Sequence, residues 1–206
     1  MPNYHISLYP DNIYHIFNRA VGSEKLFPYQ ENYEFFLKKY LCYILPIADT
    51  FAYCLLPNHF HFLIRIKTIQ NIEAHYLQMK PNKKFSLEII PDFLMERFSN
   101  LFNSYTKAYN KTYNRKGSLF IDYLKRVELK DEAQFGATIF YIHKNPVHHQ
   151  YCQNITDWKW SSYLSLLSTS GTNLLRTDVI KWFGNEEAYI KFHQQPIYLK
   201  QAVIIE

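Results

Sequence analysis

The chain has 206 residues, of which 48% are hydrophobic and 20% charged, and its formal net charge at pH 7 is +5. These values fit one soluble globular domain with a real core. No segment reaches transmembrane length, and the first residues lack the basic and apolar regions of a signal peptide, so we expect a cytoplasmic protein with no membrane partner. Three cysteines without a C-x-x-C pair indicate neither a disulfide framework nor a thiolate zinc site.

The excess positive charge is concentrated in residues 105–130. This stretch holds seven Lys or Arg residues and two acidic residues, a net charge of +5 that equals the net charge of the whole chain. Tyr and Phe residues are interleaved with the cations, and such alternation suits a single nucleic acid strand whose bases can stack. A solvated helix face over packed tyrosines explains any single residue equally well. The concentration of charge nevertheless favours a polyanionic partner.

The predicted elements follow from the spacing of apolar residues. Strands are expected over residues 13–21, as two strands separated by a turn near Asn58 in the run 51–66, and over 119–127. Helices are expected at five places: residues 32–43, a short one near 72–79 within an irregular connection over 68–93, 93–114, one starting at Asp131, and 185–193. Gly117 closes the helix over 93–114. Strands mixed with helices predict an α+β sandwich, with helices packed on an antiparallel sheet.

The pattern His59-Phe60-His61 lies in an apolar run that is typical of two strands joined by a turn. Side chains at positions i and i+2 of a strand share a face. Both imidazoles are therefore expected on one side of the sheet, where they could bind one metal ion, while Phe60 and Phe62 pack on the other side. The pair by itself is explained better by two half-buried histidines that hydrogen bonds satisfy.

The helix that starts at Asp131 carries a phenol and a carboxamide on one flank. Asp131 followed by Gln134 resembles a capping box, and Pro146 is expected to end the helix. Tyr141 and Asn145 are four residues apart, so they lie one turn from each other beside the buried stripe. A helix-end Asn and one more packed tyrosine remain the structural alternative.

Three aromatic residues and two histidines after this helix are expected to have structural or solvent roles. Trp158, Trp160 and Tyr163 are predicted to pin the C-terminal segment to the core, because large aromatic side chains gain much from burial. His148 and His149 are adjacent, so they point to different sides, and a solvated turn is expected there.

Three motifs stand in the order and spacing of a known family: LPNHFHFLI (56–64), YIHKNPV (141–147) and WKWSSY (158–163). The chain resembles the single-tyrosine HUH transposases, which include the insertion-sequence-200 group and the REP-associated tyrosine transposases. The tryptophan-rich third motif is more similar to the latter branch. Residues 14–20 and 109–120 also resemble the first strand of that family and its central helix with the following turn. The resemblance covers most of residues 13–165.

The resemblance implies a ferredoxin-like sandwich with the paired histidines on a central strand. It implies a transposase domain over 1–165 and, where the match fades, a C-terminal extension over 166–206 that packs on the same domain. It further implies that His59, His61 and Asn145 bind one Mg²⁺ or Mn²⁺ ion and that Tyr141 is the nucleophile. The expected DNA-binding cations are Arg19, Lys107, Lys111, Arg115, Lys116, Lys125 and Arg126.

The implied activity is cleavage and rejoining of hairpin-forming single-stranded DNA through a 5′-phosphotyrosine, in a protein associated with the nucleoid. A DNA-binding protein of the same fold without transposition activity is the first alternative. A zinc hydrolase built on the two histidines is the second, and it needs a further His or carboxylate and an activated water. Relatives act as monomers or as dimers that exchange the tyrosine helix, and the sequence leaves both open.

Overall fold

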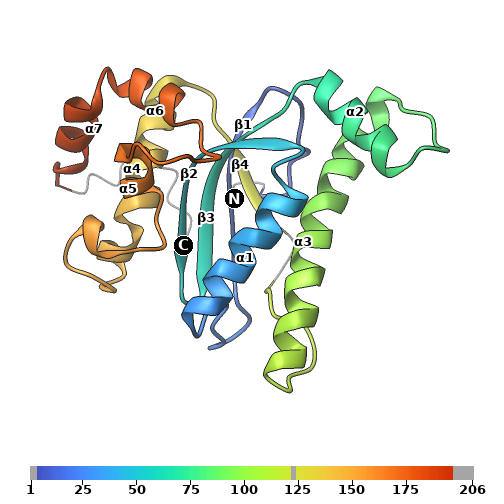
Figure 1. The fold of residues 1–206 in the computed structure, drawn as a ribbon, viewed down its shortest axis with the longest axis horizontal. Coiled ribbons are helices and arrows are strands. Elements are labelled where there is room, and N and C mark those ends of the chain that lie inside the picture. The colour runs from blue at the N-terminus through green and yellow to red at the C-terminus, as the bar shows by residue number, and fades with distance from the viewer. Residues whose placement is uncertain (1–3, 122–123, 197–206) are drawn as a thin grey trace.

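The computed structural model describes residues 4–121 and 124–196, and its centre is a four-stranded antiparallel sheet (Figure 1). The strands are β1 (Ile13–Arg19), β2 (Ala48–Leu56), β3 (His59–Ile66) and β4 (Lys125–Glu128), in the spatial order β2-β3-β1-β4. Together with α1 (Gln30–Tyr43) and α3 (Ile90–Thr112), they follow the βαββαβ order of ferredoxin-like folds. The predicted fold class is confirmed, and so is the central position of the histidine strand.

The hairpin of β2 and β3 decides which side chains face which side of the sheet. Leu56 pairs with His59, so Pro57 and Asn58 alone form the turn. Phe60 and Phe62 point toward α1, where Tyr40 stacks on Phe62 with ring centroids 4.2 Å apart. Since side chains alternate along a strand, His59 and His61 face the opposite side, as predicted.

Helices α1 and α3 cover the first face of the sheet and bury the larger of the two cores. The apolar stripe of α3 supplies Phe98, Leu101 and Tyr105, which are almost completely buried. A connection that contains α2 (Ile69–Met79) and a short 3₁₀ helix (Leu87–Ile89) precedes α3. This face therefore has the two-helix layer expected for the fold.

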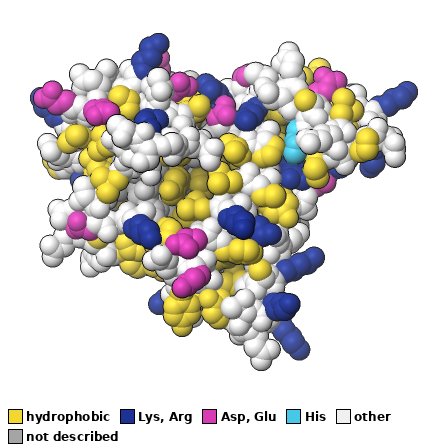
Figure 2. Space-filling view, in the orientation of Figure 1, with side chains coloured by type: hydrophobic (Ala, Val, Ile, Leu, Met, Phe, Trp, Pro, Cys, Tyr) yellow, Lys and Arg dark blue, Asp and Glu magenta, His cyan; other side chains and the backbone are white. Residues whose placement is uncertain are grey.

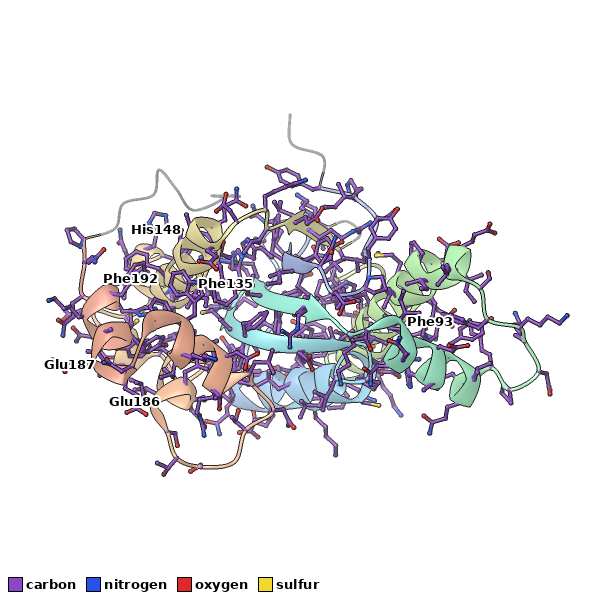
Figure 3. All side chains as sticks on the ribbon, turned by 90° about the horizontal axis from the view of Figure 1, so that it is seen from above. Phe93, Phe135, His148, Glu186, Glu187 and Phe192 are labelled. Carbon is purple, nitrogen blue, oxygen red and sulfur yellow. The ribbon has the colours of Figure 1, made fainter. Side chains whose placement is uncertain are left out.

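The second face of the sheet is covered by α4 (Glu132–His148) and, beyond it, by α5 (Tyr163–Leu167), α6 (Arg176–Phe183) and α7 (Glu186–His193). Seen from above, Phe135 of α4 and Phe192 of α7 lie on the side of the molecule away from Phe93 of α3 (Figure 3). The helices of residues 166–196 pack on α4 and β2. The domain boundary at residue 165 stays a prediction.

Several predicted boundaries differ from the structure. The helix expected over 93–114 begins earlier, at Ile90, because Pro91 in the first turn needs no intrahelical N–H partner. The strand expected over 119–127 is regular only over Lys125–Glu128, while Phe120 makes an isolated bridge to Ala20. Residues 122–123 of that strand lie outside the described residues.

Pro146 does not end α4, contrary to the prediction. The helix continues to His148, and the N–H of His149 donates to the carbonyl of Asn145 over 2.9 Å. A proline this close to the C-terminal end removes only one helical hydrogen bond. As a result, the last turn of α4 carries His149 one turn beyond Asn145.

The tryptophan-rich segment pins the chain to the sheet, as predicted. The indole N–H of Trp158 donates to the carbonyl of Leu55 over 2.9 Å, and the ring of Trp160 stacks on Tyr33 with centroids 4.5 Å apart. Tyr163 is buried in the second core.

No helix within residues 4–121 and 124–196 is long and apolar enough to cross a membrane.

Candidate active site

Two elements bring the predicted catalytic residues together on the second face of the sheet. β3 carries His59 and His61, and α4 crosses that face with Tyr141 and Asn145 on one flank. Asp131 caps α4, since its side chain accepts a hydrogen bond from the N–H of Gln134 over 2.8 Å. The cap fixes where the helix begins and thereby the side on which Tyr141 projects.

A cavity of about 470 Å³ lies at this junction. Its lining includes three of the four predicted catalytic and metal-binding residues, His59, His61 and Tyr141, and two of the predicted DNA-binding cations, Arg19 and Lys125. The remaining lining residues are Tyr4, Phe17, Asn18, Asn58, Ile121, His149 and Tyr151. The cavity thus combines imidazoles, a phenol, cations and aromatic rings.

His59 and Asn145 face each other directly. Nε2 of His59 lies 3.1 Å from Oδ1 of Asn145, and Nδ1 of His59 lies 2.7 Å from Oδ1 of Asn58. An imidazole nitrogen and a carboxamide oxygen are both ligands that a divalent cation accepts. His59 and Asn145 could therefore hold such a cation between them.

His61 is held by a histidine that the sequence did not single out. Nδ1 of His61 lies 3.0 Å from Nε2 of His15 on β1, and such a contact leaves the opposite nitrogen of the His61 ring for a ligand. Burial lowers the pKa of His15 to about 3 and, helped by the neighbouring His15 and His59, lowers the pKa of His61 well below its usual value. Both rings are neutral at pH 7, the form in which imidazole binds metals.

Tyr141 lies against this pair. Its ring meets His61 edge to face with centroids 5.4 Å apart and meets His15 in the same way at 5.9 Å. The side chain is 4% exposed, and it reaches the cavity. The phenol of Tyr141 and the imidazoles of His61 and His15 therefore lie side by side at the cavity.

The predicted cations separate into three groups. Arg19 and Lys125 line the cavity, while Lys107, Lys111 and Lys116 are exposed on α3 and the turn after it. Figure 2 shows Lys and Arg side chains along the lower end of α3. These five residues are placed where DNA could contact them.

The remaining two predicted cations have protein partners that explain them. Arg126 is 6% exposed, and its guanidinium donates to the carbonyls of His5, Ile6 and Leu124. Arg115 pairs with Glu24 over 2.9 Å and clamps the turn after α3. Arg126 holds the N-terminal segment against β4, and its contact with DNA stays a prediction.

Sequence reasoning missed His15, His149 and Tyr151. His15 lies between Tyr14 and Ile16 on β1, and a buried polar residue between apolar neighbours was the available signal. His149 was expected in a solvated turn, but its ring contacts that of His59 with centroids 4.8 Å apart. The continuation of α4 past Pro146 places it there.

The zinc hydrolase alternative loses support at this site. Within the described part of the chain, no group of three or more His, Cys, Asp or Glu side chains is arranged to hold a metal ion. Two further histidines lie beside the pair: Nε2 of His15 lies 3.0 Å from Nδ1 of His61, and the ring of His149 lies 4.8 Å from that of His59. The third candidate ligand is the oxygen of the neutral carboxamide of Asn145.

Comparisons with known proteins agree with this geometry. The chain is 24% identical over 118 residues to a protein of Haemophilus influenzae assigned provisionally as a REP-associated tyrosine transposase, and the match spans 56% of this chain and 58% of the relative. A solved structure described as a REP-associated tyrosine transposase bound to a REP hairpin superposes with a TM-score of 0.60 at 13% identity, over 84% of this chain and 93% of that one. The resemblance to REP-associated tyrosine transposases is confirmed. No protein-family model matches the chain.

The two comparisons support different conclusions. The structural match at 13% identity concerns the fold, which it shares over almost the whole solved chain. The sequence match reaches less than two thirds of the length of the relative. The substrate and the reaction of this chain therefore have to be argued from the geometry of the site itself.

Proposed function

We propose that this chain cleaves and rejoins single-stranded, hairpin-forming DNA through a covalent bond to Tyr141, with a divalent cation such as Mg²⁺ or Mn²⁺. One observation supports this function above all: Tyr141 packs on His61 in a cavity that His59 also lines, and Nε2 of His59 lies 3.1 Å from Oδ1 of the buried Asn145 behind it. The candidate nucleophile and two candidate metal ligands thus line one cavity, and the third candidate ligand contacts one of them. The hairpin substrate is suggested by the solved relative, whose description names a REP hairpin.

The chemistry is an exchange of esters. Oη of Tyr141 attacks the scissile phosphorus, the phosphorus–O3′ bond breaks, and the products are a 5′-phosphotyrosine and a free 3′-hydroxyl. The phenol loses one proton and the leaving oxygen gains one, so neither water nor ATP is consumed. A 3′-hydroxyl of another strand can reverse the step and release Tyr141.

The residues around Tyr141 have separate tasks in this reaction. His59, His61 and Asn145 would hold the cation, which supplies positive charge at the scissile phosphate when it is bound. His15 orients His61 and keeps its Nδ1 occupied. Arg19 and Lys125 are placed in the cavity wall to bind the phosphates on either side of the scissile one.

The arrangement favours a tyrosine that acts in cis. Tyr141 contacts His61 of its own chain, and both residues line the same cavity. A dimer that exchanges α4 is not needed to complete the centre. We therefore propose that a single protomer is competent for cleavage.

The test uses labelled single-stranded hairpin oligonucleotides with Mg²⁺, Mn²⁺ or a chelator, followed by denaturing electrophoresis. We expect a metal-dependent covalent adduct that Tyr141→Phe abolishes. Tyr151→Phe is the matched control, because Tyr151 lines the same cavity but is exposed and lies away from His61, so its adduct should persist. Binding without any adduct would favour the alternative of a DNA-binding protein that has lost transposition.

A further inference from the structure

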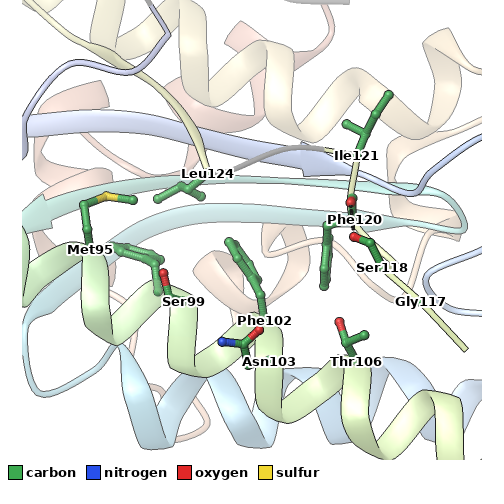
Figure 4. A pocket seen from close by; sticks show the side chains of 11 residues that line it. Met95, Ser99, Phe102, Asn103, Thr106, Gly117, Ser118, Phe120, Ile121 and Leu124 are labelled. Carbon is green, nitrogen blue, oxygen red and sulfur yellow. Dashed lines mark hydrogen bonds between the residues drawn. The ribbon is translucent and has the colours of Figure 1, made fainter.

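A second large cavity lies outside the candidate active site. It is a groove of about 550 Å³ between α3 and the segment that follows it (Figure 4). Its α3 wall is formed by Met95, Phe98, Ser99, Phe102, Asn103 and Thr106. Gly117, Ser118, Phe120, Ile121 and Leu124 line the opposite wall. None of these residues has a role in the reaction proposed above.

The lining of this groove combines aromatic surface with hydrogen-bonding groups. Phe102 of the α3 wall is half-buried and packs on the buried Phe120 of the opposite wall, with ring centroids 4.7 Å apart and at an angle of 38°. Ser99, Asn103 and Thr106 project from successive turns of α3 toward the opposite wall. An aromatic face beside amide and hydroxyl groups is the chemistry that binds an unpaired nucleobase.

The wall opposite α3 is fixed by hydrogen bonds. Arg115 donates to the carbonyls of Gly117 over 3.3 Å and Ser118 over 2.7 Å, and it is itself held by Glu24. The hydroxyl of Ser118 donates to the carbonyl of Phe120 over 2.7 Å. The groove is therefore shaped before a ligand arrives, which lowers the entropic cost of binding.

The groove shares one lining residue with the candidate active site, and two exposed cations are adjacent to its lining residues in sequence. Ile121 lines both cavities, is 50% exposed, and donates its N–H to the carbonyl of Arg19 over 3.0 Å. Two exposed cations flank the groove in sequence, since Lys107 follows Thr106 and Lys116 precedes Gly117. A strand that leaves the cavity of Tyr141 over Ile121 would meet aromatic surface and cations together.

We propose that this groove binds one or two nucleobases of the single strand that extends from the cleavage site. The inference rests on the proposed function, because it takes single-stranded DNA as the partner. It adds a subsite away from the scissile phosphate, in which Phe102 and Phe120 provide the stacking surface and Asn103 contacts the edge of the base.

The test is an abasic scan. Hairpin oligonucleotides with a single-stranded arm carry one abasic site at successive positions, and affinity is measured in chelator by fluorescence anisotropy. One or two positions should weaken binding to the protein about tenfold, since stacking of a base on an aromatic side chain contributes about 1–3 kcal/mol. Equal tolerance of every abasic position would overturn the proposal.

Two substitutions in the groove test whether the DNA position that is sensitive to an abasic site binds there. Thr106→Phe fills the groove and should weaken binding to intact DNA about tenfold while removing the sensitivity to the abasic position. Thr112→Phe makes the same change at an exposed site at the end of α3 and should behave as the original protein. Asn103→Leu removes the polar group without filling the groove, so it tests the groove even if Thr106→Phe fails to fold. It should also lose the sensitivity of binding to the abasic position.

The outcomes separate this inference from the proposed function. An abasic position that depends on Thr106, in a protein that forms no Tyr141 adduct, would support the groove and reject the reaction. The opposite result is a normal Tyr141 adduct together with unchanged affinity of Thr106→Phe for DNA and of the original protein for the abasic substrates. It would support the reaction and reject the groove.

Discussion

Two pairs of buried histidines lie beside α4, and they differ in their hydrogen bonds and in their access to a cavity. Nδ1 of His61 meets Nε2 of His15 at 3.0 Å, and Nδ1 of His143 meets Nε2 of His193 at the same distance. The first pair borders the cavity of Tyr141, whereas the second lies entirely within the core between α4 and α7.

The hydrogen bonds of the second pair form a closed network. Nε2 of His143 lies 2.8 Å from the hydroxyl of Ser162, and Nδ1 of His193 lies 2.8 Å from the carbonyl of Tyr189. In the first pair, Nδ1 of His61 and Nε2 of His15 share one hydrogen bond, Nδ1 of His15 has no partner within the described residues, and the ring of His61 lines the cavity. A buried polar group that the protein satisfies fully stabilises the fold, while one that opens to a cavity is available for chemistry.

Removing His61, whose ring lines the cavity of Tyr141, should have the largest effect on the reaction. We expect His61→Ala to slow adduct formation by about a thousandfold or more, because a bound cation contributes several kcal/mol to transition-state stabilisation. The measurement is the single-turnover rate of adduct formation at saturating DNA. Hairpin binding in chelator and the thermal unfolding midpoint serve as controls, and a His61→Ala protein with a normal rate would remove the cation from the mechanism.

Removing His143, whose ring nitrogens both have protein partners, should lower stability instead. We expect His143→Ala to lower the free energy of unfolding by about 2–4 kcal/mol, because it creates a cavity and leaves the buried hydroxyl of Ser162 and the ring of His193 with fewer partners. Urea denaturation measures this change. The adduct rate of the folded fraction at low temperature should stay within about tenfold of the original, and a larger loss would mean that the closed network also positions Tyr141.

The closed pair should also make stability depend on pH. Burial lowers the pKa of His193 to about 4, against the opposing effect of the hydrogen bond that the ring donates to the Tyr189 carbonyl and with a smaller contribution from the charge of Lys144. The unfolded chain binds a proton near pH 6.5 and the folded chain does not. Stability is therefore complete above about pH 6.5 and falls as the pH drops toward 4, by about 2 kcal/mol at pH 5 for this group.

The variant His193→Gln tests that dependence. It keeps a side chain that can hydrogen-bond to His143 but does not titrate in this range. We expect the difference in unfolding free energy between pH 7 and pH 5 to become smaller by about 2 kcal/mol. An unchanged difference would assign the acid sensitivity to other histidines, of which His15 is the first to examine.

The candidate centre was predictable where the chemistry depends on local periodicity. The two-residue spacing of His59 and His61 placed both on one face of a strand, and the four-residue spacing of Tyr141 and Asn145 placed them on one flank of a helix. These relations need only the geometry of a strand and of a helix. The family resemblance supplied their roles, because the spacing alone was explained better by structural histidines.

What could not be predicted depends on contacts between distant parts of the chain. Arg126 was expected on a DNA-binding surface, yet its partners include carbonyls about 120 residues away. His149 reached His59 only because α4 continues through Pro146, which local rules expected to end it. The partners of His143 come from Ser162 and His193, and no pattern around any of the three identified the network.

The smallest effect is expected where the C-terminal helices close over α4, at Gly136. A Cβ atom added there would lie 2.2 Å from Cη2 of Trp182 on α6, which no pair of carbon atoms tolerates. Trp182 is 37% exposed and can move outward, so the cost is modest. Alanine also favours a helix over glycine by about 1 kcal/mol, and we expect Gly136→Ala to lower the unfolding free energy by only about 1 kcal/mol.

A double-mutant cycle with Trp182→Leu separates the two contributions at Gly136. With the indole removed, the same Gly136→Ala change should raise the free energy of unfolding by up to about 1 kcal/mol, because only the helix preference remains. The sign of the substitution would thus reverse between the two backgrounds. A stabilising effect already present with Trp182 in place would mean that α6 is held loosely on α4, and that the closed network of His143 and His193 depends on α7 alone.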